Sequence, residues 1–158
     1  MKILVAGIGN IFFADDGFGV EVAQRMARQP MPDGVTVVDY GIRGMHLAYD
    51  MLAGYDVTIL VDAVPRSGAP GTVYVIDVTS AGVGALRPPR QLDPHGMTPD
   101  AVLDLLGALG GDAGQVYVVG CEPASTDEEM GLSPAVSGAI DTAIAAVMEL
   151  VEAALVAI

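Results

Sequence analysis

The stretch KILVAGIGNIFFADDGFG, residues 2–19, joins an apolar β-branched run to a glycine-rich turn that carries two neighbouring acids. The run predicts a strand. The residues after it, 16–29, predict a helix, because large apolar side chains recur at i, i+4 and i+8: Phe18, Val22 and Met26. A strand, a tight turn and a helix in this order begin a βαβ unit, so the stretch indicates an α/β fold.

Further β-branched runs extend this pattern along the chain. Strands are predicted at residues 2–7, 35–40, 56–64, 72–78 and 115–120. A second helix is predicted over 43–54, with Met45, Tyr49 and Leu52 on one face. Alternation of strands and helices favours a parallel sheet with right-handed crossovers. The connection 65–71 is too short for such a crossover, so the fourth strand is expected to run antiparallel.

The remaining segments complete a three-layer α/β/α sandwich around a five-stranded mixed, mostly parallel sheet. Residues 80–97 form a Gly- and Pro-rich loop, and a helix with Pro99 in its first turn follows. The apolar C-terminal segment 139–158 carries its acids on one narrow arc and predicts an amphipathic helix that docks on the sheet, not a membrane span. One domain over residues 1–158 is expected.

Composition excludes several classes of function. A net charge of -13 with only 7 Lys and Arg argues against binding to nucleic acid or to anionic membranes. The single cysteine, Cys121, rules out an intrachain disulfide and a zinc site built on several thiolates, which favours a cytoplasmic location. Cys121 itself is expected to be a small buried apolar residue. A monomer is expected.

Three residues are candidates for a common site. Asp16 follows the first strand, Asp62 ends the third, and His95 lies in the long loop before the last strand. Ligands of open α/β sheets bind beyond the carboxyl ends of the strands, and a strand order of 2-1-3 would bring Asp16 and Asp62 together there. Two carboxylates and an imidazole suit a divalent ion such as nickel or zinc.

Each of these residues also has a purely structural explanation. Asp15 and Asp16 could cap the helix that follows or interact with its dipole, and His95 could be solvated. Asp62 is costly to bury at the end of an apolar strand unless something pairs with it. His46, within i+4 reach of Asp50, is expected to be an exposed surface residue.

A dinucleotide site is the main competing interpretation of the opening turn. Gly7 and Gly9 after the first strand, with Asp39 at the end of the second, resemble the Rossmann fingerprint. Phe12 occupies the third glycine position, however, and the acids at 15 and 16 would repel a pyrophosphate. Neither HExxH nor GxSxG occurs, so hydrolysis would have to use carboxylates and a metal.

Several motifs together resemble the hydrogenase maturation proteases, which trim the C-terminal extension of the large subunit of nickel-iron hydrogenases. The motifs are GIGNIFFADDGFG at 7–19, DYGIRGM at 39–45, LVDAV at 60–64, GAPGTV at 68–73, DPHGM at 93–97, VGCEP at 119–123 and GLSPAV at 131–136. The resemblance runs over nearly the whole chain. It implies a phosphorylase/hydrolase-like α/β/α sandwich with one antiparallel strand.

The resemblance also implies a mechanism. Asp16, Asp62 and His95 would contact nickel carried by the precursor and form the catalytic site, and no permanently bound cofactor is implied. The metal would position the scissile bond, and attack by metal-activated water or by a carboxylate base both remain open. Asp39 and Glu122, at strand ends near the same edge, could support these residues. A nickel-binding maturation chaperone without peptidase activity is an alternative.

Overall fold

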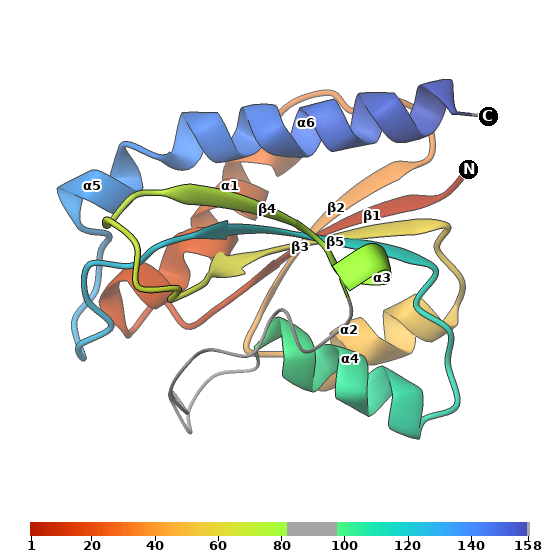
Figure 1. Ribbon diagram of the computed structural model, residues 1–158, viewed down its shortest axis with the longest axis horizontal. Coiled ribbons are helices and arrows are strands. Elements are labelled where there is room, and N and C mark those ends of the chain that lie inside the picture. The colour runs from red at the N-terminus through yellow and green to blue at the C-terminus, as the bar shows by residue number, and fades with distance from the viewer. Residues whose placement is uncertain (82–97, 158) are drawn as a thin grey trace.

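The computed structural model describes residues 1–81 and 98–157 and contains a five-stranded sheet (Figure 1). The strands are β1 Ile3–Ile8, β2 Val35–Gly41, β3 Val57–Ala63, β4 Val73–Asp77 and β5 Gln115–Cys121. Their order across the sheet is β2-β1-β3-β5-β4. The pairs β1–β2, β1–β3 and β3–β5 are parallel, and β4 is antiparallel to β5. The predicted 2-1-3 order and the antiparallel fourth strand are therefore confirmed.

Helices cover both faces of the sheet and form the predicted three layers (Figure 1). Helices α1 Phe18–Ala27 and α6 Ile140–Val156 lie on one face, and α2 Gly44–Leu52 and α4 Pro99–Ala108 lie on the other. The short helical segments are η1 Ala14–Gly17, α3 Val78–Ala81 and α5 Pro134–Ser137. Both chain termini lie at the edge of the sheet where β1 begins.

The core consists of two apolar layers, one on each face of the sheet. Alternate residues of β1 point to opposite faces: Ile3 and Val5 pack with α1 and α6, whereas Leu4 and Ala6 pack with α2 and α4. Every residue of β1 and β3 is buried. This explains why both strands are apolar nearly throughout their length.

Helix α1 begins with a close approach to the sheet. A Cβ on Gly7 would overlap the main-chain oxygen of Gly19, and a Cβ on Gly19 would overlap the main-chain oxygens of Ile8 and Val61. The glycines of the opening turn therefore bring the first turn of α1 directly onto β1 and β3. They serve close helix–strand packing.

Helix α2 forms where it was predicted, with Met45, Tyr49 and Leu52 on one face. That face is exposed, whereas Leu47, Ala48 and Met51 are buried against the sheet and α4. Apolar residues occur on both sides of this helix, so their period alone does not identify the inner side. The C-terminal helix agrees with its prediction, since its acids are exposed and Ile140, Ala143, Val147 and Val151 are buried. In the described residues, no helix has the length and apolar character needed to cross a bilayer.

Candidate functional site

Loops from several elements meet at the carboxyl edge of the sheet, on the left in Figure 1. Strands β1, β2, β3 and β5 all end there because they are parallel. The loop after β1 contains Asp16, β3 reaches the edge at Asp62, and β5 is followed by Glu122. This is the place at which an open α/β sheet binds its ligands.

Asp16 and Asp62 meet on either side of Gly9. Asp62 is only 3% exposed, and its Oδ1 accepts a hydrogen bond from the backbone N–H of Ala63 at 2.8 Å. Oδ2 of Asp16 accepts one from the backbone N–H of Asn10 at 2.8 Å. A Cβ placed on Gly9 would lie 3.5 Å from Asp62 Oδ1 and would overlap the main-chain oxygen of Asp16. The backbone of Asp16 and the carboxylate of Asp62 therefore both lie close to Gly9 at the carboxyl ends of the strands, and the joint action of the two acids stays a prediction.

Gly9 is constrained by its own backbone as well as by its neighbours. Its φ is 142°, a value that residues with a side chain rarely adopt, and its N–H donates to the carbonyl of Gly41 at 2.9 Å. The bond links the ends of β1 and β2 next to the acid pair. A glycine at this position therefore determines how close the loop with Asp16 comes to the end of β3.

Asp15 has a different role from its neighbour Asp16. It is fully buried, and both carboxylate oxygens accept hydrogen bonds from the segment after β5. Oδ2 accepts from the N–H groups of Ala124 (2.8 Å) and Ser125 (3.2 Å), while Ser133 donates its N–H to Oδ1 (2.7 Å) and its hydroxyl to Oδ2 (2.9 Å). Four donors compensate for the burial of this charge. Asp15 thus fastens residues 124–133 beside the site, a structural role but not the helix cap considered from the sequence.

Glu122 fastens a second loop at the same edge. Its Oε1 accepts hydrogen bonds from the backbone N–H groups of Arg66 and Gly68, each at 2.8 Å, and from the Tyr74 hydroxyl at 2.7 Å. Desolvation, together with this bond, raises the pKa of Tyr74 above its ordinary value. Glu122 therefore shapes the connection between β3 and β4, and support of Asp16, Asp62 and His95 by Glu122 stays a prediction.

The remaining candidates are placed as follows. Asp39 lies near the end of β2, and its Oδ2 accepts a hydrogen bond from Gln24 Nε2 at 3.1 Å. His46 is exposed on α2, 3.6 Å from Asp50, as predicted. Cys121 is fully buried, also as predicted, and burial raises the pKa of its thiol to about 11. His95 lies outside the described residues.

Two of the three predicted ligands, Asp16 and Asp62, belong to the described residues. Within residues 1–81 and 98–157, no three His, Cys, Asp or Glu side chains gather closely enough to hold a metal by themselves. Asp16 and Asp62 would therefore act together with a ligand from elsewhere, either another part of this chain or the molecule that brings the ion. Carboxylate oxygens are suitable ligands for divalent cations.

Sequence reasoning did not find the fastening of residues 124–133 by Asp15. The partners Asp15 and Ser133 are 118 positions apart. The only local signal in the sequence is that two aspartates, Asp15 and Asp16, are adjacent. The N-cap of α5 by Ser133, whose Oγ accepts from Val136 N, marks the other end of this contact.

Comparison with known proteins gives a consistent result for sequence and for structure. The family model described as hydrogenase maturation protease matches residues 20–150. The hydrogenase 2 maturation protease of Escherichia coli K12 is 35% identical over 150 residues, which cover 94% of this chain and 89% of the relative. The hydrogenase expression/formation protein HupD of Rhodobacter capsulatus is also 35% identical, with coverage of 94% and 71%.

A solved structure has the same fold over nearly the full length of both chains. The hydrogenase maturating endopeptidase HybD from E. coli superposes with a TM-score of 0.83 at 32% identity, covering 98% of this chain and 94% of that one.

Proposed function

Because the chain belongs to the hydrogenase maturation protease family and is a peptide hydrolase, we propose that it removes the C-terminal extension of a nickel-iron hydrogenase large-subunit precursor after nickel has been inserted. The observation that carries the proposal is the convergence of Asp16 and Asp62 across Gly9 at the carboxyl edge of the sheet. Carboxylate oxygens suit a divalent cation, and an ion presented by another protein can reach the site together with the chain that carries it.

In the proposed mechanism, Asp16, Asp62 and His95 contact nickel that belongs to the substrate. The two described carboxylates come from different elements, so they approach the ion from the end of β3 and from the turn before α1. These contacts position the scissile peptide bond beside the site and make recognition of the metal a condition for cleavage. Precursor without nickel lacks this anchor and is not cut.

The proposal includes the surroundings in which the protease works. We expect no permanently bound cofactor, no binding to nucleic acid and a monomeric protein in the cytoplasm. The support is compositional: the net charge is -13, and the single cysteine is a buried free thiol. Light scattering of the purified protein tests the monomer.

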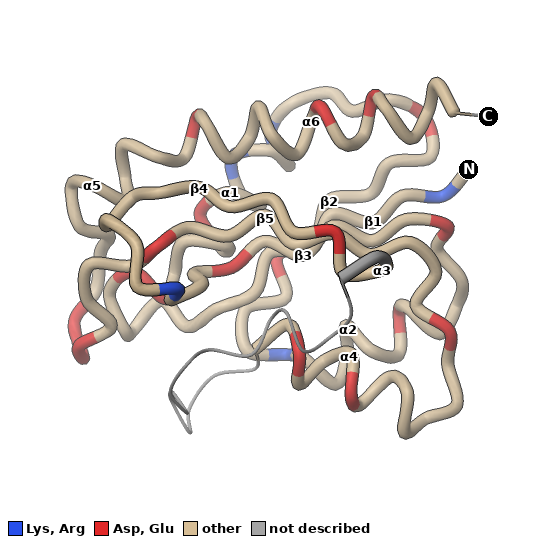
Figure 2. The backbone as a smooth tube through the Cα atoms, viewed as in Figure 1, with Lys and Arg blue, Asp and Glu red and all other residues tan. Residues whose placement is uncertain are grey.

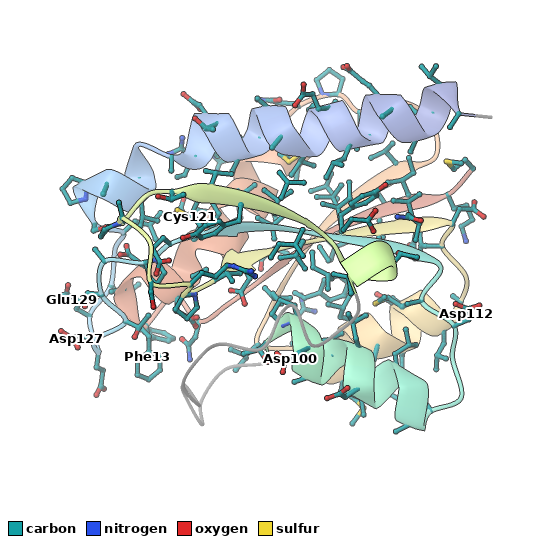
Figure 3. All side chains as sticks on the ribbon, in the orientation of Figure 1. Phe13, Asp100, Asp112, Cys121, Asp127 and Glu129 are labelled. Carbon is teal, nitrogen blue, oxygen red and sulfur yellow. The ribbon has the colours of Figure 1, made fainter. Side chains whose placement is uncertain are left out.

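Mass spectrometry of the precursor after incubation with the protein tests the function. Wild-type protein should remove a discrete C-terminal peptide from nickel-loaded precursor and leave metal-free precursor intact. Asp62→Asn and Asp16→Asn should lower the cleavage rate by more than the roughly 10- to 100-fold that loss of a supporting partner costs at a metal site. Asp112→Asn is the matched control, since it makes the same change on an exposed residue at the opposite end of the molecule (Figure 3).

Three results would contradict parts of the proposal. Equal cleavage of nickel-loaded and metal-free precursor would exclude the recognition of nickel. Normal cleavage by both Asp variants would show that the site lies elsewhere. Tight binding of nickel-loaded precursor by wild-type protein without any mass loss would instead identify a maturation chaperone.

A further inference from the structure

Large apolar side chains are exposed around the acid pair. They come from three loops at the carboxyl edge and from the first turn of α2, and we call them the edge surface: Ile11, Phe12, Ile42, Met45 and Met130. Phe12, Ile42 and Met130 are 57%, 58% and 67% exposed. Single apolar residues on a surface are ordinary, but aromatic and Met side chains gathered beside a functional site are typical of a protein interface.

Hydrogen bonds hold each of these loops next to the acids. Asn10, whose N–H donates to Asp16, accepts from the N–H of Phe12 through Oδ1 at 2.9 Å. Gly41, which accepts from Gly9 N at 2.9 Å, directly precedes Ile42. These contacts place Phe12 and Ile42 at fixed positions relative to the acid pair.

The third loop is held in the same way. The carbonyl of Glu129 accepts from Ala14 N at 2.7 Å, so Met130 comes next to the turn that contains the acids. Phe13, Asp127 and Glu129 lie at the same end of the molecule in Figure 3. The edge surface is therefore preorganised before any partner binds, which lowers the conformational entropy lost on association.

The charge of this edge specifies the partner further. Asp127, Glu128 and Glu129 are consecutive and exposed in the loop that carries Met130, and Figure 2 shows acidic residues at this end of the chain trace. The basic residues of the described loops here are Arg43 and Arg66. Arg43 donates to the carbonyls of Tyr40 and Asp39, and the guanidinium of Arg66 lies 5.8 Å from the centre of the Tyr74 ring.

We propose that the edge surface, with the acids 127–129, docks a segment of the hydrogenase precursor that is both apolar and basic, and so sets the affinity for the substrate. This inference rests on the proposed function, because a precursor whose scissile bond reaches Asp16 and Asp62 must cover the residues around them. Apolar contacts with Phe12, Ile42 and Met130 supply affinity, whereas the acids attract basic groups and favour the correct partner. The acid pair and the docking surface are separate parts of the protein, so their effects can be separated by experiment.

The first test measures binding apart from cleavage. The Kd for metal-free precursor, which is not cut, is obtained by biolayer interferometry, and kcat and KM are obtained with nickel-loaded precursor. Phe12→Ser and Ile42→Ser should each raise Kd and KM about tenfold, as loss of a central apolar contact does, and leave kcat within about twofold. Val75→Ser is the control, because Val75 is 53% exposed on the edge strand β4 and lies outside the edge surface.

The second test addresses charge. Glu128→Gln combined with Glu129→Gln should weaken binding of metal-free precursor several-fold at low salt and reduce the dependence of Kd on ionic strength. Glu149→Gln combined with Glu152→Gln makes the same change in net charge on exposed residues of α6 and should have no effect. If the two double variants weaken precursor binding equally, the net charge of the protein governs binding, and the proposed local role of residues 127–129 is wrong.

Failure of the docking proposal differs from failure of the proposed function. If wild-type protein trims the precursor and both Ser variants keep the Kd and KM of Val75→Ser, the edge surface is not the docking site. If wild-type protein binds metal-free precursor through the edge surface but does not trim nickel-loaded precursor, the docking stands and the protease function fails. A dimer of the purified protein that dissociates with Ile42→Ser would assign the surface to a second copy of this chain and overturn the proposal.

Discussion

Replacing Asp15 by Ala should loosen the segment after β5 and destabilise the whole fold. The substitution removes an acceptor for three backbone N–H groups and one hydroxyl, all within 3.2 Å of the carboxylate. A buried donor left without a partner costs about 1–3 kcal/mol, and Asp15 serves four donors, so we expect a loss of about 3–5 kcal/mol in the free energy of unfolding. At about 2–4 °C per kcal/mol for a domain of this size, the melting temperature should fall by roughly 6–20 °C.

Urea unfolding followed by circular dichroism measures this change, and the m-value checks that the transition stays two-state. Ser133→Ala removes one of the four bonds to Asp15 and the N-cap of α5, so it should cost only about 1–2 kcal/mol. Asp127→Ala, an exposed acid of the same loop, should stay within about 0.5 kcal/mol of wild type. A melting temperature of Asp15→Ala equal to that of Asp127→Ala would refute the conclusion that Asp15 holds residues 124–133 in place.

Two further predictions concern Gly9 and Cys121. Gly9→Ala should destabilise the protein by more than Gly54→Ala does. Both glycines have a positive φ, but only the new methyl group at position 9 would overlap other atoms. Thermal melts of the two variants therefore isolate the cost of that overlap, which is on the order of 1–3 kcal/mol. Gly9→Ala should also abolish cleavage by displacing Asp16; equal melts would contradict the tight approach. Burial raises the pKa of Cys121 from about 9 to about 11, so the protein favours the neutral thiol, and this part of the stability is complete below pH 9 and is lost as the pH rises to 11. Urea titrations at pH 8 and pH 10.5 should show a larger loss for wild type than for Cys121→Ala, and equal losses would exclude this cause.

Local patterns in the sequence were enough to predict the strands and helices and to place the acidic residues at the strand ends. The β-branched runs and the helical period are properties of neighbouring residues. The connection 65–71 is too short for a parallel crossover, so its length alone predicts that β4 is antiparallel. Asp62 could be placed at the sheet edge because it ends an apolar strand. The short link between β1 and α1 likewise placed Asp16 at the carboxyl end of β1.

Contacts between distant residues decided the rest. The sequence pattern gives Asp15 and Asp16 the same local surroundings, yet one is buried by donors 109 to 118 positions away and the other meets Asp62 at Gly9. Helix α2 carries apolar residues on both sides, and only packing on the sheet and α4 selects Leu47 and Met51 as its inner face. The sequence by itself determined which residues reach the carboxyl edge, because periodicity and strand ends are local. The tertiary structure alone decided which acid is structural and which apolar residues remain exposed for a partner, because burial and hydrogen bonding depend on segments that meet only in the folded chain.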